Sequence, residues 1–359
     1  MAARRLHCAQ AWVEANAAAD DPWATNYLAT NANGTGPYML EEWLPNEYAL
    51  LSRYDNYYGG PAEVAQVVSL LSQDDTTTRL SLEKGEVDAV QRLPDDMVRA
   101  LADNPVITTY NKPTSSSVFW VFNTEVAPFD DLRVREAIVK AIDYDGLMDG
   151  LVQEGGVRMN SPVYQEMPYH AADLPMPERD IEGAKALLAD AGYADGLEID
   201  LVYVDFGLIK QVAVVLQASL AEAGINANLV EMPFPAFLEG VGNNEIGFYS
   251  WVSEPNYPHP LAIVERFSSS TLDGGLGGNI SRFVDPEFDA LVEQIRETSD
   301  EAELTELFAQ AQEMIMQNYL WLLLYQESLY QVTGEWVDGF DFGAYNYLDM
   351  RDISIDRGE

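Results

Sequence analysis

The clearest pattern of hydrophobic and polar positions lies just beyond the middle of the chain. Residues 197–204 are rich in apolar side chains, as in a strand, and residues 208–223 place apolar side chains at the spacing of an amphipathic helix. Gly224 closes that helix, and a second strand-like stretch follows at 225–231. These lengths predict a right-handed βαβ crossover, so part of the chain is α/β.

The first third of the chain predicts an antiparallel hairpin. Two extended stretches, 38–43 and 48–54, flank the turn-forming residues 44–46. A Val- and Leu-rich run at 64–71 predicts a third strand. Before the hairpin, the Ala-rich residues 9–19 favour a helix that a proline then stops.

The other apolar segments predict further helices and strands. Asp131 can cap a helix whose apolar residues follow at helical spacing, and two more helical stretches lie at 288–296 and 301–318. Strand-like runs lie at 106–110, 117–122 and 322–332. The aromatic-rich run at 117–122 is more typical of a core than of a ligand platform. Together these elements predict an α/β fold with at least two lobes.

Charge excludes several classes of partner. The 359 residues include 20 Lys and Arg against 59 Asp and Glu, a formal net charge of −39. A surface this acidic repels phosphate, which excludes nucleic acid as a direct partner and disfavours anionic membranes. The longest strongly apolar run, 320–325, is too short to cross a bilayer, so no direct membrane insertion is expected. The hydrophobic fraction of 47% is ample for packed cores.

The acidic residues are spread along the whole chain, and two interpretations of them stay open. They fit adaptation to a saline environment, and they fit an ordinary acidic protein outside the cytoplasm. At the N-terminus, no apolar segment long enough for an export signal follows Arg5 before Glu14, so we expect no signal peptide in this chain. Cys8 is the single cysteine and allows no internal disulfide.

Patterns of catalytic and metal-binding residues are largely absent from the sequence. The three histidines, His7, His170 and His259, are far apart and lack metal-ligand spacing. The sequence contains no nucleophile elbow, P-loop or zinc-protease motif. With 59 carboxylates, chance acidic pairs are expected everywhere, so a glycosidase-type pair is disfavoured. We therefore predict no cofactor, no metal and no catalytic residue.

One segment, 247–260, combines aromatic side chains with a single acid. Tyr249, Trp251 and Tyr257 surround Glu254, and three prolines restrict the backbone. Aromatic rings and one carboxylate suit a pocket for an apolar ligand that carries a cationic group. Alternatively, Trp251 belongs to the core and Glu254 is a solvated loop acid. Residue types alone favour this second interpretation.

Taken together, several motifs resemble the peptide-type solute-binding proteins of ABC importers, the bacterial extracellular family 5. They occur in the family's order from about residue 20 almost to the C-terminus. The matching residues are Asp21-Pro22-Trp23-Ala24, Gly34-Thr35-Gly36-Pro37-Tyr38, Trp43, Pro45, Arg53, Tyr57-Tyr58-Gly59-Gly60-Pro61, Arg79-Leu80, Gly85-Glu86-Val87-Asp88, Phe122-Asn123-Thr124, Pro128-Phe129-Asp130-Asp131-Leu132-Arg133-Val134-Arg135-Glu136-Ala137-Ile138, Ala191-Gly192-Tyr193 and Asp289.

The resemblance implies an α/β, two-lobed fold like that of periplasmic binding proteins (type II), with the first lobe incomplete. Family members are usually longer, and the part without a counterpart here precedes Gly34. We expect residues 1–110 to be the remaining part of lobe I, 111–325 to be lobe II, and 326–359 to return to lobe I. The two crossings between lobes would form the hinge.

The resemblance also implies a ligand site. Peptide-binding members have a W-x-x-D segment whose Asp holds the peptide's ammonium group, and Trp251-Val252-Ser253-Glu254 is its counterpart with Glu in place of Asp. Ser250 and Val252 would pair through their backbones with an extended ligand. The ligand-binding residues expected on this basis are Trp251, Glu254, Ser250, Val252, Tyr249 and Tyr257.

The expected function is that of a non-enzymatic, periplasmic or otherwise extracytoplasmic component of an ABC importer, which binds small peptides between its lobes and delivers them to the permease. One alternative is a non-peptide solute such as an oligosaccharide, with Trp251, Tyr249 and Tyr257 stacking on sugar rings. A second is a truncated remnant that binds nothing. The least favoured is a hydrolase, which would need two acids facing each other at roughly 5–10 Å.

Overall fold

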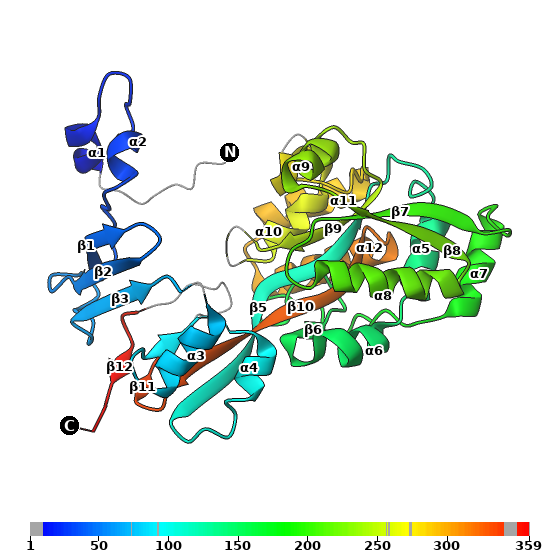
Figure 1. Ribbon diagram of the computed structural model, residues 1–359. Coiled ribbons are helices and arrows are strands. Elements are labelled where there is room, and N and C mark those ends of the chain that lie inside the picture. The colour runs from blue at the N-terminus through cyan, green and yellow to red at the C-terminus, as the bar shows by residue number, and fades with distance from the viewer. Residues whose placement is uncertain are drawn as a thin grey trace. The chain divides into compact units, whose positions relative to one another are not determined.

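The computed structural model describes residues 10–72, 74–91, 93–255, 257, 259–272, 275–340 and 350–358 (Figure 1). The chain divides into two compact units. Unit 1 comprises Met1–Lys112 and Tyr330–Glu359, and unit 2 comprises Pro113–Leu329. The predictions for Cys8 and for the start of the chain lie outside the described residues. The assignment of the units to the lobes of a binding protein stays a prediction.

Unit 1 contains the predicted hairpin and third strand. Strands β1, β2 and β3 form an antiparallel sheet in that order, with Trp43 opposite Ala49 across the first pair. The helices of unit 1 are α1 (Gln10–Asn16), α2 (Thr25–Leu28), α3 (Asp75–Glu83) and α4 (Asp95–Arg99). Its strands are β1 (Tyr38–Leu44), β2 (Tyr48–Arg53), β3 (Gln66–Leu70), β4 (Ala89–Val90), β11 (Val337–Asp338) and β12 (Ser354–Ile355).

The β1–β3 sheet keeps apolar side chains exposed. No described residue of these strands is buried, and Trp43, Val68 and Leu70 are each about half exposed. The core of unit 1 lies instead around Leu82 and Val332, where α3, α4, β4 and the end of β10 (Trp321–Gly334) meet. The hairpin is therefore formed by strand pairing, and burial contributes little to it.

Unit 2 contains the large sheet, with strand order β10-β5-β9-β7-β8 and β6 paired to β10. The strands are β5 (Ile107–Phe122), β6 (Gly156–Arg158), β7 (Leu197–Tyr203), β8 (Ile225–Glu231), β9 (Phe248–Ser253) and β10 (Trp321–Gly334). Both β5 and β10 continue into unit 1, where Val332 of β10 pairs with Val90 of β4. The parallel pairing of β7 with β8, joined by a helix, confirms the predicted βαβ crossover.

Strand β5 corrects the expectation of two separate strands at 106–110 and 117–122. The polar residues between these runs are also extended, and residues 114–117 are at most 3% exposed. Their hydroxyls find partners, since Thr114 donates to the Glu327 carbonyl and Ser116 donates to the Glu327 carboxylate at 2.6 Å. The hydropathy pattern does not predict this stretch as a strand. Ser and Thr side chains can be buried when their hydroxyls form hydrogen bonds, although they are polar.

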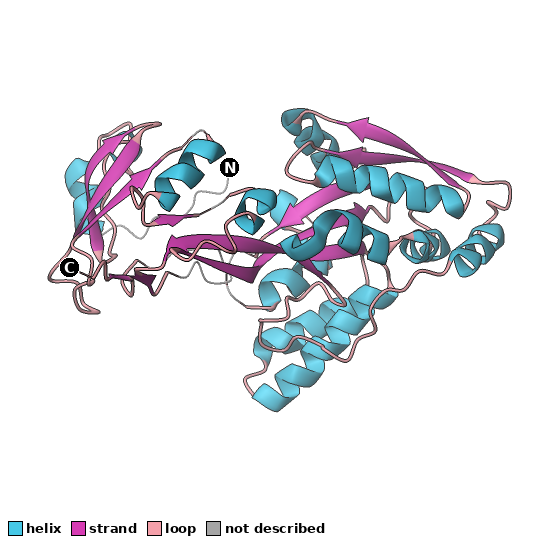
Figure 2. Ribbon diagram, turned by 60° about the horizontal axis from the view of Figure 1, so that its bottom comes forward, coloured by secondary structure: helices cyan, strands magenta, loops and turns pink. Residues whose placement is uncertain are grey.

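Helices cover both faces of the unit 2 sheet (Figure 2). They are α5 (Leu132–Ala141), α6 (Tyr144–Leu147), α7 (Ile181–Asp190), α8 (Ile209–Glu222), α9 (Phe234–Gly242), α10 (Leu261–Val264), α11 (Pro286–Glu297) and α12 (Glu301–Gln317). A π-helical turn at Met148–Val152 and 3₁₀ turns at Gln153–Gly155, Glu265–Phe267, Ser269–Thr271 and Gly275–Gly277 complete the helical segments. Helix α9 was not expected, because its Pro and Gly residues favour a loop.

The core of unit 2 confirms that the aromatic run on β5 is structural. Phe119, Trp120 and Phe122 have no exposed surface. Phe122 stacks on Phe248 of β9 with ring centroids 4.5 Å apart, and Phe119 stacks on Trp321 of β10 at 4.0 Å. Trp120 and Phe122 face the cluster formed with α5, α7 and α8. In the part of the chain that the structure describes, no helix is long and apolar enough to cross a membrane.

Two substitutions on α8 test this assignment of the core. Leu216 has no exposed surface, so Leu216→Ala is expected to cost about 2–5 kcal/mol of unfolding free energy through lost burial and a cavity. Val214 on the same helix is 50% exposed, and Val214→Ala should change stability by no more than about 0.5 kcal/mol. Urea unfolding followed by circular dichroism measures both. Equal effects would show that α8 does not pack as described.

Candidate functional site

Strand β9 is the centre of the candidate site. It pairs with β5 along its whole length, from Phe248 opposite Phe122 to Ser253 opposite Ser117. On its other edge β9 meets β7 at a single position, Tyr249 opposite Val202. Past Tyr249, no described strand pairs with this edge of β9.

The register shows which backbone groups face that edge. The N–H of Asn123 donates to the carbonyl of Gly247 at 2.8 Å, directly before the first pair of the ladder. Because hydrogen-bonded pairs alternate along antiparallel strands, the backbone groups of Tyr249, Trp251 and Ser253 point toward β5. Those of Ser250 and Val252 therefore point to the opposite edge. The residues on either side of Trp251 thus direct their backbone groups to the edge of β9 that lies opposite β5.

The two aromatic residues of β9 differ in exposure. Tyr249 is 1% exposed and its hydroxyl donates to the Ile280 carbonyl at 2.9 Å, and burial raises its pKa. Trp251 is partly exposed and packs beside Phe237 of α9, with ring centroids 6.0 Å apart. The side chain of Tyr249 is therefore part of the interior, and a direct ligand contact for it would require this part of the core to open.

Tyr257 and Glu254 lie on the segment that follows β9, and both are exposed. The Tyr257 hydroxyl donates to the Glu265 carboxylate at 3.1 Å. Burial and the neighbouring Glu265 charge raise the pKa of Tyr257 to about 12, so it stays protonated at neutral pH. Of the predicted side chains, those of Trp251, Glu254 and Tyr257 are thus accessible to a solute, whereas Ser250 is buried and can contribute through its backbone.

Sequence reasoning missed the residues that lie behind this segment. Arg266 is 8% exposed, and its guanidinium donates to the Ser253 hydroxyl and, at 3.1 Å, to the Glu254 carbonyl. Tyr164 is 2% exposed and donates to the Ser253 carbonyl at 2.8 Å. The one signal for Arg266 is a lone cation inside the apolar run 261–267.

Asp289 of α11 holds the turn that follows Arg266. Its carboxylate accepts hydrogen bonds from the Ser268 hydroxyl at 2.8 Å, from the Ser269 N–H at 2.8 Å and from the Ser269 hydroxyl. Desolvation alone would raise the pKa of Asp289, but these hydrogen bonds outweigh it and keep the pKa below its usual range. The ionised carboxylate is therefore the form that stabilises this turn.

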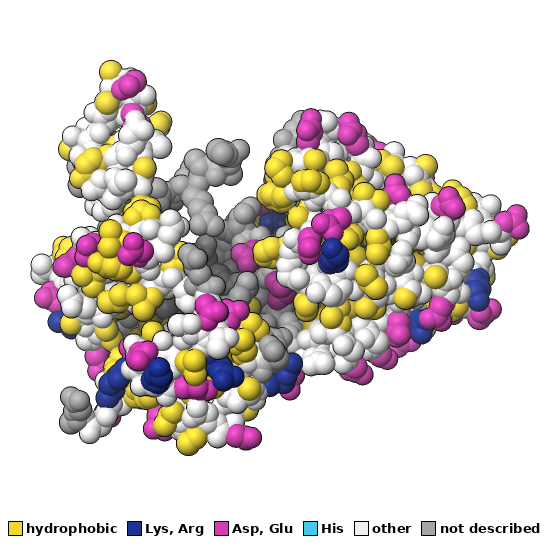
Figure 3. Space-filling model, in the orientation of Figure 1, with side chains coloured by type: hydrophobic (Ala, Val, Ile, Leu, Met, Phe, Trp, Pro, Cys, Tyr) yellow, Lys and Arg dark blue, Asp and Glu magenta, His cyan; other side chains and the backbone are white. Residues whose placement is uncertain are grey.

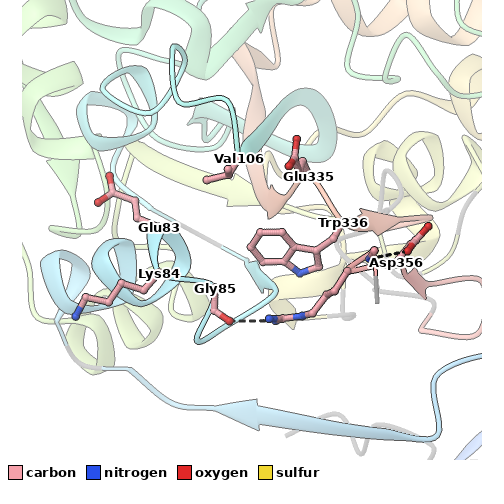
Figure 4. A pocket seen from close by; sticks show the side chains of 9 residues that line it. Glu83, Lys84, Gly85, Val106, Glu335, Trp336 and Asp356 are labelled. Atoms are coloured by element: carbon pink, nitrogen blue, oxygen red, sulfur yellow. Dashed lines mark hydrogen bonds between the residues drawn. The ribbon is translucent and has the colours of Figure 1, made fainter.

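Unit 1 contains a separate pocket of about 560 Å³ beside Trp336 (Figure 4). The indole N–H donates to the Asp88 carboxylate at 2.7 Å, and the Arg357 guanidinium lies 4.8 Å from the ring centroid. Arg357 also bonds the Gly85 carbonyl at 3.0 Å and Asp88 at 2.7 Å. These contacts fasten the C-terminal segment to the loop after α3, so the Arg357 charge at this pocket is engaged within the fold.

The described residues hold no group of three or more His, Cys, Asp and Glu side chains arranged to bind a metal ion. Acidic side chains are spread over the visible surface and do not gather in one patch (Figure 3). The polar and aromatic groups at the end of β9 are accessible to solvent.

Comparison with known proteins identifies the fold class. The structure is similar to HbpA2 from Haemophilus parasuis, with a TM-score of 0.80 and 23% identity over 90% of this chain and 64% of that one. It is also similar to the dipeptide-binding protein of Pseudoalteromonas sp. SM9913 solved in complex with Met-Leu, with a TM-score of 0.78 and 22% identity over 97% and 69% of the two chains. The predicted α/β fold of periplasmic binding proteins is confirmed.

The chain belongs to the bacterial extracellular solute-binding proteins, family 5, whose middle-region model matches residues 4–275. Among curated relatives, the probable D,D-dipeptide-binding periplasmic protein DdpA of Escherichia coli is 26% identical over 328 residues. That match covers 90% of this chain and 62% of DdpA. The resemblance drawn from the sequence motifs is thus confirmed, and the chain spans less than two thirds of this relative's length.

Asp289→Asn tests the turn behind the site. Because the folded-state pKa of Asp289 is depressed, its stabilisation is complete above the unfolded-state pKa near 3.9 and is lost as the pH falls through the folded value. The variant should lose about 1.5–3 kcal/mol at pH 7, as expected for hydrogen bonds to a charged group. Urea titrations at pH 7 and pH 3 should show this difference shrinking with acid. A pH-independent difference would contradict the assignment.

Proposed function

We propose that this protein is a solute-binding component of an ABC importer and that it binds small peptides at the end of β9. The observation that supports this most is the edge of β9 past Tyr249. There the strand has no paired neighbour among the described strands, and it leads directly to the exposed Glu254. DdpA and the Pseudoalteromonas protein are both described as dipeptide-binding, which agrees with a peptide ligand.

The backbone geometry suits an extended peptide. The Ser250 N–H belongs to the parallel pairing with Val202 of β7, but the Ser250 carbonyl and both backbone groups of Val252 face the edge beyond it. A ligand in β conformation can pair with these groups as an added strand. Backbone hydrogen bonds do not depend on the identity of the ligand's side chains, so this pairing is compatible with peptides of different sequence. Trp251 offers a partly exposed ring against which a ligand side chain can pack.

Glu254 supplies the charge. It follows the last residue of β9 directly, so a peptide lying along the strand can bring its α-ammonium group to this carboxylate. A charge-assisted hydrogen bond between the two would fix the peptide's direction and register. The longer Glu side chain, compared with the Asp of other members, places the amine one methylene farther from the strand.

The remaining assignments follow from this function. A binding role needs no catalytic residue, cofactor or metal, and the partner that receives the solute is the permease. The location is periplasmic or otherwise extracytoplasmic, as DdpA's description as a periplasmic protein suggests. We assign unit 1 to lobe I and unit 2 to lobe II of the binding protein.

Glu254→Gln tests the amine contact. Isothermal titration of the protein with trialanine and with N-acetyl-trialanine compares a free amine with a blocked one. Trialanine should bind the variant about 10- to 100-fold more weakly than it binds the wild type, because a charge-assisted hydrogen bond is lost. N-acetyl-trialanine should bind both proteins equally weakly.

Glu239→Gln is the matched control, since Glu239 is an exposed acid on α9 of the same unit. It should leave trialanine affinity unchanged. A thermal-shift screen with oligosaccharides distinguishes the alternative, because a bound solute raises the melting temperature. Stabilisation by sugars and not by peptides would overturn the peptide assignment, and an unchanged affinity in Glu254→Gln would exclude the amine contact.

A further inference from the structure

Arg266 is a buried cation, and removing its charge from water costs free energy that its contacts must offset. It lies on the 3₁₀ turn after α10, between the buried Val264 and Phe267, and is 8% exposed. Arg266 forms no ion pair among the described residues, although the nearby Glu265 charge favours its ionised form, and its Nε–H is buried without a hydrogen-bond partner. Burial lowers its pKa, which reflects the cost of keeping the charge there.

The hydrogen bonds of Arg266 all go to two consecutive residues. One guanidinium nitrogen donates to the Ser253 hydroxyl, and the other donates to the Glu254 carbonyl at 3.1 Å. Tyr164, which comes from a different part of unit 2, donates to the Ser253 carbonyl at 2.8 Å and lies 3.0 Å from the Ser117 hydroxyl. The side chains of Arg266 and Tyr164 therefore both form hydrogen bonds to the C-terminal end of β9.

These contacts restrict the backbone on either side of Glu254. The Ser253 carbonyl belongs to the peptide plane before Glu254, and the Glu254 carbonyl belongs to the plane after it. Because peptide units are planar, holding both carbonyls restricts the two backbone dihedral angles of Glu254. Those angles determine the direction in which its Cα–Cβ bond leaves the chain. The two buried groups thus set the direction of an exposed side chain.

We propose that Arg266 is a positioning residue, which together with Tyr164 aims the Glu254 carboxylate at the ligand's ammonium group. This proposal rests on the proposed peptide function for its consequence, although the contacts stand independently. A residue that breaks the rules of core composition is expected where binding requires it. Preorganised ligand groups bind more tightly because less ordering is needed on binding.

The first test needs no ligand. Arg266→Met keeps the length of the side chain and removes its charge and donors. Hydrogen exchange should become about tenfold faster or more in peptides that cover β9 and Glu254, because the end of the strand can then open locally. The melting temperature should change little, because removing the buried charge offsets the loss of only two hydrogen bonds. Arg266→Lys keeps the charge but has a single donor group. Its exchange rate at the end of β9 should lie between those of the wild type and Arg266→Met.

The second test uses the preference for a free amine. In the wild type we expect trialanine to bind more tightly than N-acetyl-trialanine, and in Arg266→Met the ratio of the two dissociation constants should fall about tenfold toward one. A purely structural role would weaken both peptides together and leave the ratio unchanged. Arg266→Lys should restore part of the ratio.

Arg135→Met is the matched control. Arg135 is also buried in unit 2, at 5% exposure, and its bonds go to the carbonyls of Phe129, Asp130 and Asn318. This variant should lower the melting temperature and leave exchange near Glu254 and the ratio of dissociation constants unchanged. Wild-type exchange rates in Arg266→Met, or an unchanged ratio with lower affinity, would overturn the proposal. Absence of peptide binding in the wild type would overturn the proposed function, while the exchange experiment would still decide the role of Arg266.

Discussion

The antiparallel ladder between β5 and β9 is the constraint on which the rest of unit 2 depends. Its register places Phe122 on Phe248 in the core and Ser117 opposite Ser253 at the other end. The same register decides that Trp251 turns its backbone toward β5 and that the groups on either side of it face the open edge. A shift of one residue would reverse every side chain of β9, exchanging the buried face for the other.

The order of the strands determines where the pairing between β9 and β7 ends. Strand β7 pairs with β8 over seven positions but meets β9 at one, so the sheet separates just where β9 approaches Glu254. In open α/β sheets, ligands bind outside the carboxyl ends of the strands, at the point where the strand order reverses. The end of β9 is where we propose that the ligand binds, and its aromatic and acidic side chains are accessible.

The distribution of charge adds a second theme. In a chain with 20 cationic side chains against 59 acids, both Arg135 and Arg266 are buried in unit 2. Burying cations makes the surface still more acidic, which keeps the protein soluble but gives up possible surface pairs. Arg135 satisfies three backbone carbonyls near the start of α5, whereas Arg266 leaves one donor unused. This contrast agrees with a structural role for Arg135 and with the positioning role that we propose for Arg266.

The sequence by itself determined the βαβ crossover, the β1–β2 hairpin and the family, because apolar periodicity, turn residues and ordered motifs are local properties of the chain. It also pointed to Trp251 and Glu254, whose roles stay predictions. Only the tertiary structure decided that Tyr249 is interior, that β5 is one continuous strand, and that Arg266 reaches Ser253. Those outcomes depend on hydrogen bonds between residues that are separated in sequence. Hydropathy does not predict which buried polar group will find a hydrogen-bond partner.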